Sequence, residues 1–103
     1  MNIKELMKQP KKLASGHRTC SGCAIPILVR TILAATDKPT VICAATGCLE
    51  VTTTVYPQSS WKCPFIHSAF ENSAATMSGV SRAFQALKKK GKMKKDVKFI
   101  VFG

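Results

Sequence analysis

The chain has 103 residues, the size of one domain or part of one, and 46% of them are hydrophobic, enough to bury a core. Sixteen Lys and Arg against five Asp and Glu give a net charge of +11. The positive charge is concentrated in two runs, at residues 4–12 and 88–98, which are typical of solvated tails and turns. Because the stacking aromatics of an RNA-binding sheet are also missing, nucleic acid is not an expected partner.

Five cysteines are many for a chain of this length, and their number is odd. The first residues are polar and do not resemble a secretory leader, so a disulfide framework is not expected. Metal binding or catalysis in a cytoplasmic protein is the better interpretation. No apolar run approaches the roughly 20 residues that a transmembrane helix requires, so no membrane partner is expected.

The first half of the chain predicts two helices and a strand. Residues 2–8 form a short amphipathic pattern that ends before Pro10, and residues 9–19 read as a basic connector. Pro26 suits the first turn of a helix, and the apolar run that follows predicts a mostly buried helix to residue 35. Residues 40–45 are apolar without alternation, which favours a strand buried on both faces of a parallel sheet.

The second half predicts a long loop, a helix and a second strand. Residues 49–67 look irregular, with 51–55 as an extended piece. Ser68 and Glu71 have the spacing of a capping box, and the helix behind it is expected to run to about Lys90 and stop at Gly91. One apolar stripe is expected on that helix, formed by Phe70, Ala74, Met77, Val80, Phe84 and Leu87.

Residues 97–102 predict a second buried strand, so the order strand, helix, strand indicates a βαβ unit. The fold class expected is α/β, a partial parallel sheet with flanking helices. Because two parallel strands do not make a finished fold, the chain is expected to be a fragment truncated after its second core strand. Residues 1–15 are expected to be an amino-terminal helix and connector, and residues 16–103 to be part of one domain.

Three cysteines form the most informative pattern. Cys20 and Cys23 lie one turn apart, and Cys48 follows the strand at residues 40–45, where open α/β sheets place ligands. Cys20-x-x-Cys23 fits half a zinc site, a redox dithiol or part of an iron–sulfur site. For zinc, His17, Cys43 and Cys48 are the candidate partners; for a [4Fe–4S] cluster, Cys20, Cys23 and Cys48 supply three of four ligands.

The other candidate residues have structural interpretations. Cys43 lies inside the expected strand and reads as a small buried hydrophobe, and Cys63 reads as a bystander in the irregular loop. His17 is expected to be a hydrogen-bonding loop residue. His67 either caps the helix that follows it or lines a pocket.

Long motifs make the chain resemble the beta subunit of pyruvate:ferredoxin oxidoreductase (pyruvate synthase), the subunit with the diphosphate-type domain for thiamine diphosphate. The resemblance covers residues 14–103. The matching motifs, in order, are Gly16-His17-Arg18-Thr19-Cys20-Ser21-Gly22-Cys23, Ala45-Thr46-Gly47-Cys48-Leu49-Glu50-Val51, and Tyr56-Pro57-x-x-Ser60-Trp61-x-x-Pro64-x-Ile66-His67-Ser68-x-Phe70-Glu71-Asn72. The last motif resembles the pyruvate type more than the 2-oxoglutarate type.

The resemblance implies a ligand set and a cofactor. Cys20, Cys23 and Cys48 match three ligands of a [4Fe–4S] cluster, and the fourth ligand lies beyond this chain. Gly47 and Cys48 border the thiamine diphosphate. Ile25 stands at a position near that cofactor where the family often has Glu, so a polar contact is lost if one is made there. The magnesium site begins beyond Gly103, and no catalytic residue is carried over to this chain.

The resemblance also implies an oxidoreductase with alpha, gamma and delta-type subunits, in which pyruvate, coenzyme A and ferredoxin are the reactants. The fragment alone is expected to be inactive. Two other classes remain open at this point. One is a small zinc-binding or RNA-binding module, and the other is a naturally short subunit that completes its fold against a separately encoded chain.

Overall fold

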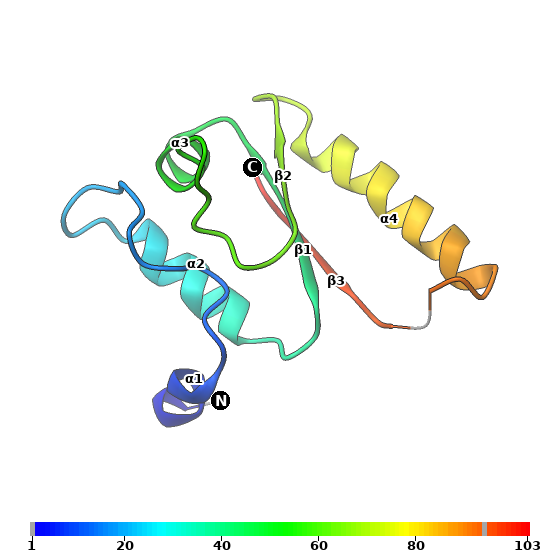
Figure 1. Ribbon diagram of the computed structural model, residues 1–103, viewed down its shortest axis with the longest axis horizontal. Helices are drawn as coiled ribbons and strands as arrows, with labels where there is room; N and C mark the ends of the chain where they lie inside the picture. The colour runs from blue at the N-terminus through cyan, green and yellow to red at the C-terminus, as the bar shows by residue number, and fades with distance from the viewer. Residues whose placement is uncertain (1, 94) are drawn as a thin grey trace.

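The computed structural model describes residues 2–93 and 95–103. Within these ranges, two helices come first, and strands and helices then alternate around one sheet (Figure 1). In chain order they are α1 (Ile3–Lys8), α2 (Ile25–Ala34), β1 (Thr40–Ala45), α3 (Cys48–Thr53), β2 (Phe65–Ser68), α4 (Ser73–Lys89) and β3 (Lys98–Phe102). The helices expected at residues 2–8 and from Pro26, and both expected strands, are confirmed.

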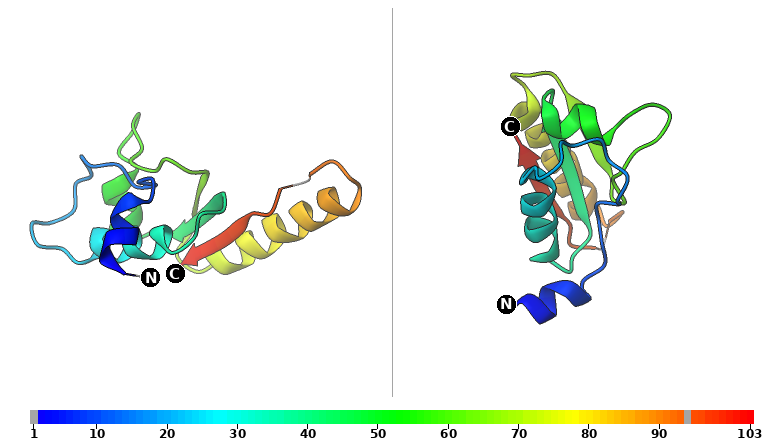
Figure 2. Two further views of the ribbon diagram at one scale, coloured as in Figure 1. Left: turned by 90° about the horizontal axis from the view of Figure 1, so that it is seen from below. Right: turned by 90° about the vertical axis from the view of Figure 1, so that its left-hand side faces the viewer.

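The sheet is parallel, with the strand order β2-β1-β3. β1 pairs through residues 42–45 with β2 and through residues 40–44 with β3. Since β1 has a neighbour on each edge, its backbone can bond within the sheet. An uninterrupted apolar run suits it because helices cover both faces of the sheet (Figures 1 and 2). The α/β class, a parallel sheet with flanking helices, is confirmed.

The sheet has one strand more than expected. β2 begins at Phe65, within residues 49–67 that were predicted to be irregular, and ends at Ser68, so the sheet is not limited to two core strands. This strand is four residues long and includes His67 and Ser68, so it lacks the apolar run by which a strand is recognised. It forms because β1 presents an unpaired edge, with Ala45 opposite Ser68 at the end of the ladder.

Helices cover both faces of the sheet, with α2 on one side and α4 on the other (Figures 1 and 2). Side chains alternate between the faces of a strand, so Ile42 and Ile100 belong to the α2 face. Cys43 lies on the α4 face, where its thiol points to the Ser73 carbonyl at 3.5 Å. On the same face, Phe84 of α4 packs edge-on against Phe99, with ring centroids 5.4 Å apart.

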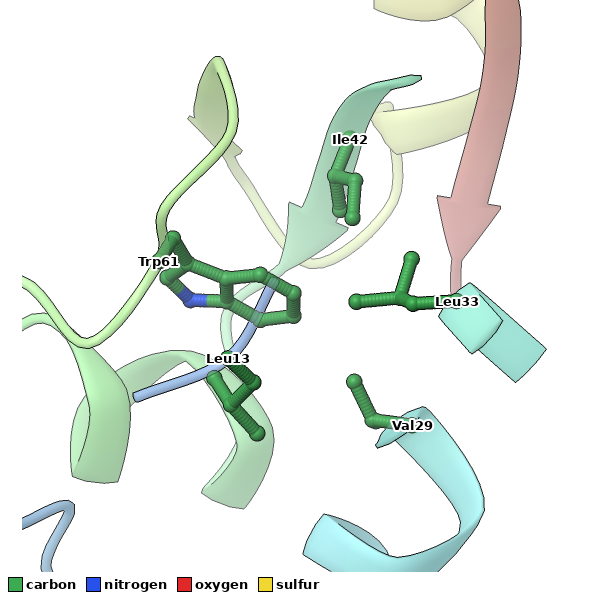
Figure 3. Packing of buried hydrophobic residues seen from close by; sticks show 5 residues of the cluster. All are labelled: Leu13, Val29, Leu33, Ile42 and Trp61. Atoms are coloured by element: carbon green, nitrogen blue, oxygen red, sulfur yellow. The ribbon is translucent and has the colours of Figure 1, made fainter. Parts of the chain in front are cut away.

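The main core lies between α2 and the sheet. Figure 3 shows its five buried side chains converging: Leu13, Val29, Leu33, Ile42 and Trp61. The Trp61 ring stacks on Phe65 at 4.7 Å, and its indole N–H donates to the buried Thr53 hydroxyl at 2.8 Å. The Ser60 N–H also donates to the Thr53 carbonyl at 2.8 Å, so the Trp61 loop is fixed by packing and by polar contacts to α3.

Leu13 reaches this core from the segment expected to be a basic connector. Leu13 is 1% exposed and forms an antiparallel bridge with Trp61. The Ala14 N–H donates to the Ser60 carbonyl at 2.6 Å, and the Lys62 N–H donates to the Lys12 carbonyl at 2.8 Å. The segment around Leu13 thus packs into the fold and bonds to the Trp61 loop. The division of the chain after residue 15 stays a prediction.

Helix α3 replaces the extended piece expected at residues 51–55, so that prediction is wrong. The run of β-branched residues favours a strand, but each threonine hydroxyl here donates to a carbonyl one turn earlier. Thr52 binds the Cys48 carbonyl at 2.5 Å, Thr53 binds that of Leu49 at 2.5 Å, and Thr54 binds that of Glu50 at 2.8 Å. These bonds satisfy the hydroxyls inside the helix.

The expected capping box at Ser68 is wrong. Ser68 ends β2, and its hydroxyl donates to the Asn72 side-chain oxygen at 2.5 Å and lies 2.8 Å from the Thr76 hydroxyl. α4 therefore starts at Ser73, with Asn72 as its N-cap and no side-chain cap bond. The Ser68 hydroxyl is engaged between the strand and the helix, so it does not accept from the backbone N–H of Glu71 as the capping box requires.

The stop at Gly91 is confirmed. Gly91 has a φ of 77°, and its N–H donates to the Lys88 carbonyl at 3.1 Å, while the Lys92 N–H donates to that of Leu87 at 3.0 Å. This pair of bonds is the Schellman motif. The apolar stripe is confirmed only in its middle, because Met77 is buried but Phe70, which precedes the helix, is 75% exposed.

The expectation of a mostly buried α2 is also wrong. Pro26, Val29 and Leu33 are buried, but Ile27 is 66% and Leu28 is 58% exposed. One side of α2 packs on the sheet and the opposite side is open. Among residues 2–93 and 95–103, no helix combines the length and apolar character needed to cross a membrane.

Replacing Thr53 by valine keeps the side-chain shape but removes the acceptor of the Trp61 indole N–H. The N–H then stays buried without a partner, so we expect the free energy of unfolding to fall by about 1–3 kcal/mol. Urea denaturation measures the change. Thr31→Val is the matched control, since this exposed hydroxyl also binds a carbonyl one turn earlier. A loss of equal size in both variants would contradict the role of the buried bond.

Candidate functional site

The carboxyl ends of the three parallel strands meet at one edge of the sheet. Thr46-Gly47-Cys48 follows β1, Ser68 ends β2 and Gly103 follows β3. In Figure 1 the carboxyl terminus lies at this edge, near α3 and the end of β2. Open α/β sheets bind ligands at such an edge, so the structure places Gly47 and Cys48 where the sequence predicted them.

Cys48 is the first residue of α3 and is exposed. Gly47 precedes it as the N-cap in an extended conformation, and the Gly47 carbonyl accepts from the Val51 N–H at 2.9 Å. The Cys48 carbonyl accepts from the Thr52 hydroxyl. The backbone on either side of the thiol is thus bonded, while the thiol itself faces solvent.

Cys20 and Cys23 form a tight turn before α2. The Cys23 N–H donates to the Cys20 carbonyl at 3.0 Å, and Gly22 between them has a φ of 75°, a left-handed conformation that favours glycine. Cys20 is exposed and Cys23 is half-buried. A single turn can therefore present both thiols from one end of α2.

A backbone hydrogen bond ties the two cysteine-bearing segments together. The Arg18 N–H donates to the Thr52 carbonyl at 2.9 Å, which joins the loop before Cys20 to the helix that begins at Cys48. His17 lies in the same loop, where its Nδ1 is 2.8 Å from the Thr19 hydroxyl and its Nε2 is 3.4 Å from Arg30. His17 is a hydrogen-bonding loop residue, as expected.

The structure does not bring the three thiols together as one metal site. In the part of the chain that it describes, no three Cys, His, Asp or Glu side chains are grouped as a metal ion would need. The donor chemistry nevertheless fits an iron–sulfur cluster, because the free thiols of Cys20, Cys23 and Cys48 are the ligand type that it takes. These thiols lie on two loops that the Arg18 contact joins.

Ile25, the residue expected near the cofactor, is the first residue of α2 and packs against the core. With Leu49 and Phe102 it lines an apolar pocket of about 380 Å³ beside the carboxyl end of β3. Its neighbours in the pocket include the apolar side chains of Leu28, Val29 and Val101, and isoleucine has no polar side-chain atom, so this side chain can exclude water but cannot bind a polar group.

Cys43 and Cys63 stand apart from the exposed thiols. Cys43 has no exposed surface, and its burial raises the pKa of the thiol, an effect that a contact with Ser68 partly offsets. Burial likewise raises the pKa of the half-buried Cys63 thiol, with partial compensation from the charge of Lys12. Cys43 is a buried small side chain, as expected.

A polar cluster that sequence reasoning missed lies at the same edge. The His67 Nε2 is 2.8 Å from the Thr46 hydroxyl, and the His67 Nδ1 is 3.5 Å from Glu50 Oε1. Glu50 is 7% exposed, and the Thr54 hydroxyl lies 2.8 Å from its Oε1 and shares its one proton between this oxygen and the Glu50 carbonyl. The available signal was the single acidic residue among the apolar and threonine residues that follow Cys48.

No protein-family model matches the chain. Among curated proteins, it is similar to the pyruvate synthase subunit PorB of Thermotoga maritima, with 47% identity over 112 aligned positions that span the entire chain and 35% of the relative. It is similar to the same subunit of Methanocaldococcus jannaschii, with 52% identity over 82% of the chain and 29% of the relative. The chain thus spans about a third of the length of these relatives.

A more distant relative is the ketoisovalerate oxidoreductase subunit VorB of Pyrococcus furiosus, with 30% identity over 84% of the chain and 28% of the relative. The chain is therefore more similar to subunits named for pyruvate than to this one named for a branched 2-oxo acid. The alignment with the Thermotoga maritima subunit covers the whole chain, so it includes both cysteine-bearing segments.

Alkylation with iodoacetamide near neutral pH should separate the thiols by exposure. We expect Cys43 to react at least about tenfold more slowly than Cys20 and Cys48, because burial both shields it and raises its pKa, which lowers its thiolate fraction. Peptide mass spectrometry at timed intervals measures each rate. As a control, all five thiols should react at similar rates in urea. If Cys43 reacts as fast as Cys48 in the folded chain, the expected burial of Cys43 is contradicted.

Proposed function

Because this chain belongs to the pyruvate synthase PorB subunit family, we propose that it is part of the beta subunit of a pyruvate:ferredoxin oxidoreductase. Such an enzyme decarboxylates pyruvate, transfers the acetyl group to coenzyme A and passes the electrons to ferredoxin. The observation that carries the proposal is the 47% identity to the Thermotoga maritima subunit along the entire chain. The greater similarity to pyruvate synthase subunits than to VorB supports pyruvate as the 2-oxo acid.

The proposed role of this chain is to supply ligands and one wall of a cofactor site. Cys20, Cys23 and Cys48 are proposed as three ligands of a [4Fe–4S] cluster, with the fourth ligand elsewhere in the full-length protein. Gly47 and Cys48 are proposed to border thiamine diphosphate, and Ile25 to exclude water from that border. When bound, thiamine diphosphate supplies the carbon nucleophile for decarboxylation, and the cluster accepts electrons.

Because the chain spans about a third of the length of its relatives, we propose that the rest of a longer protein and other subunits supply the remaining parts of the enzyme. These parts are the magnesium ion with its ligands, the fourth cluster ligand and the alpha, gamma and delta-type subunits. Ferredoxin, pyruvate and coenzyme A are the proposed reaction partners. The proposal needs a reducing compartment such as the cytoplasm, where the thiols of Cys20, Cys23 and Cys48 persist.

Anaerobic reconstitution with ferrous iron, sulfide and an added small thiol tests the ligand set. We expect a brown chain that contains iron and sulfide in about equal amounts. Cys20→Ser, Cys23→Ser and Cys48→Ser should each lose most of this iron, because one thiolate ligand is removed from a site that already lacks its fourth. Cys63→Ser is the matched control and should keep it, because Cys63 is half-buried and lies in another loop.

Two outcomes of the reconstitution would contradict the cluster proposal. One is a colourless chain that binds one zinc ion through the same cysteines, which would favour the small zinc-binding module. The other is equal iron loss in Cys63→Ser and Cys48→Ser, which would indicate iron bound without the proposed ligand set.

The isolated chain is expected to be inactive, because it spans only about a third of the length of its relatives and is tested without partner subunits. We expect the reconstituted chain not to reduce a viologen dye when pyruvate is added. The assay contains coenzyme A, thiamine diphosphate and magnesium. A full-length enzyme of the PorB family with its other subunits is the positive control. Pyruvate-dependent reduction by the chain alone would contradict the expectation.

A further inference from the structure

His67 bridges the two residues that flank Cys48 at a spacing of two. Thr46 lies two residues before Cys48 and Glu50 two residues after it, and each contacts a different ring nitrogen of His67. We infer that His67 is a positioning residue that clamps the turn carrying Cys48. The inference rests on the proposed function for its purpose, since that function makes Cys48 a cluster ligand, but not for its geometry.

The Thr46 side of the clamp belongs to the sheet. Nε2 of His67 is 2.8 Å from the Thr46 hydroxyl, which also donates to the Ser68 carbonyl at 3.3 Å. The Thr46 N–H donates to the same carbonyl at 3.1 Å, one step beyond the Ala45–Ser68 pair that ends the ladder. The hydroxyl proton can instead go to Nε2, and the neutral ring then carries its own proton on Nδ1, the nitrogen that faces Glu50. β2 thus holds the chain just before Cys48.

The Glu50 side of the clamp belongs to α3. Glu50 is 7% exposed, which is unusual for a carboxylate and requires polar partners. Thr54 donates to Oε1 at 2.8 Å, and His67 Nδ1 faces the same oxygen at 3.5 Å. The imidazole therefore adds a second polar neighbour to this carboxylate oxygen, from β2 and not from the helix.

Both ring nitrogens of His67 are engaged by these contacts, so the histidine is built into the turn and is not a free ligand. The turn needs such support, because α3 has six residues and its N-cap glycine provides no side-chain bond. The Arg18 N–H contact to Thr52 fixes α3 from the other cysteine loop. His67 and Arg18 together hold the Cys48 segment from two sides before any cluster binds. Residues that orient metal ligands in this way commonly raise the affinity of a site.

Amide hydrogen exchange of the 103-residue chain, read by mass spectrometry, tests the clamp without any cluster. In His67→Ala, the amides of residues 46–54 should exchange about threefold to tenfold faster, the size expected for the loss of one or two hydrogen bonds. Residues 25–34 in α2 are the internal reference and should keep their rate. Because no iron is present, this result is independent of whether the cysteines bind a cluster.

Conservative variants separate positioning from general destabilisation. Thr46→Ser keeps the hydroxyl and should keep the native exchange rate, whereas Thr46→Val removes it and should accelerate the same segment. Thr46→Val should accelerate exchange less in the His67→Ala chain than in the native chain, because His67→Ala has already removed the contact between the two side chains. Glu50→Gln keeps an acceptor for Thr54 and His67 and should resemble the native chain more than Glu50→Ala does.

The inference is overturned if His67→Ala leaves residues 46–54 unchanged, or if it accelerates residues 25–34 by the same factor. If His67→Ala does not fold, the comparison of Thr46→Val with Thr46→Ser decides: equal exchange rates in residues 46–54 overturn the clamp. A cluster that fails to form in an otherwise clamped chain would contradict the proposed ligand set and leave the clamp standing.

Discussion

The pairing of β1 with a parallel strand on each edge is the constraint on which the rest of the structure depends. β1 sends Ile42 into the α2 core and Cys43 towards α4, and neither side chain has exposed surface. Both neighbouring strands run in its direction, so all three chain segments that leave their carboxyl ends emerge at one edge. The turn with Thr46, Gly47 and Cys48 is fixed there because the strand before it cannot shift register without exposing its core side chains.

That edge explains how a short chain can prepare parts of a site. The Cys48 turn is held by β2 through Thr46 and by the other cysteine loop through the Arg18 contact to Thr52. The Cys20–Cys23 turn ends against α2, which the core anchors through Val29 and Leu33. Each cysteine-bearing turn is thus attached to the fold by named contacts, although the three thiols are not grouped in the part of the chain that the structure describes.

Sequence reasoning succeeded where one local pattern decides the structure. The apolar run of β1, Pro26 in the first turn of α2 and Gly91 after α4 are each recognisable without tertiary information. It failed at α3, because its threonines favour a strand until their hydroxyls bind carbonyls one turn earlier. It missed the His67 cluster because Thr46 and His67 are 21 residues apart, and only the pairing of β2 with β1 brings them together.

The central claim is that Cys20, Cys23 and Cys48 share one [4Fe–4S] cluster. Low-temperature electron paramagnetic resonance of the anaerobically reconstituted and dithionite-reduced chain tests it most directly. The account predicts the signal of a reduced [4Fe–4S] cluster, present in the native chain and absent when Cys48 is replaced by serine. A reduced native chain with no such signal, or a Cys48→Ser chain with the full signal, would contradict it.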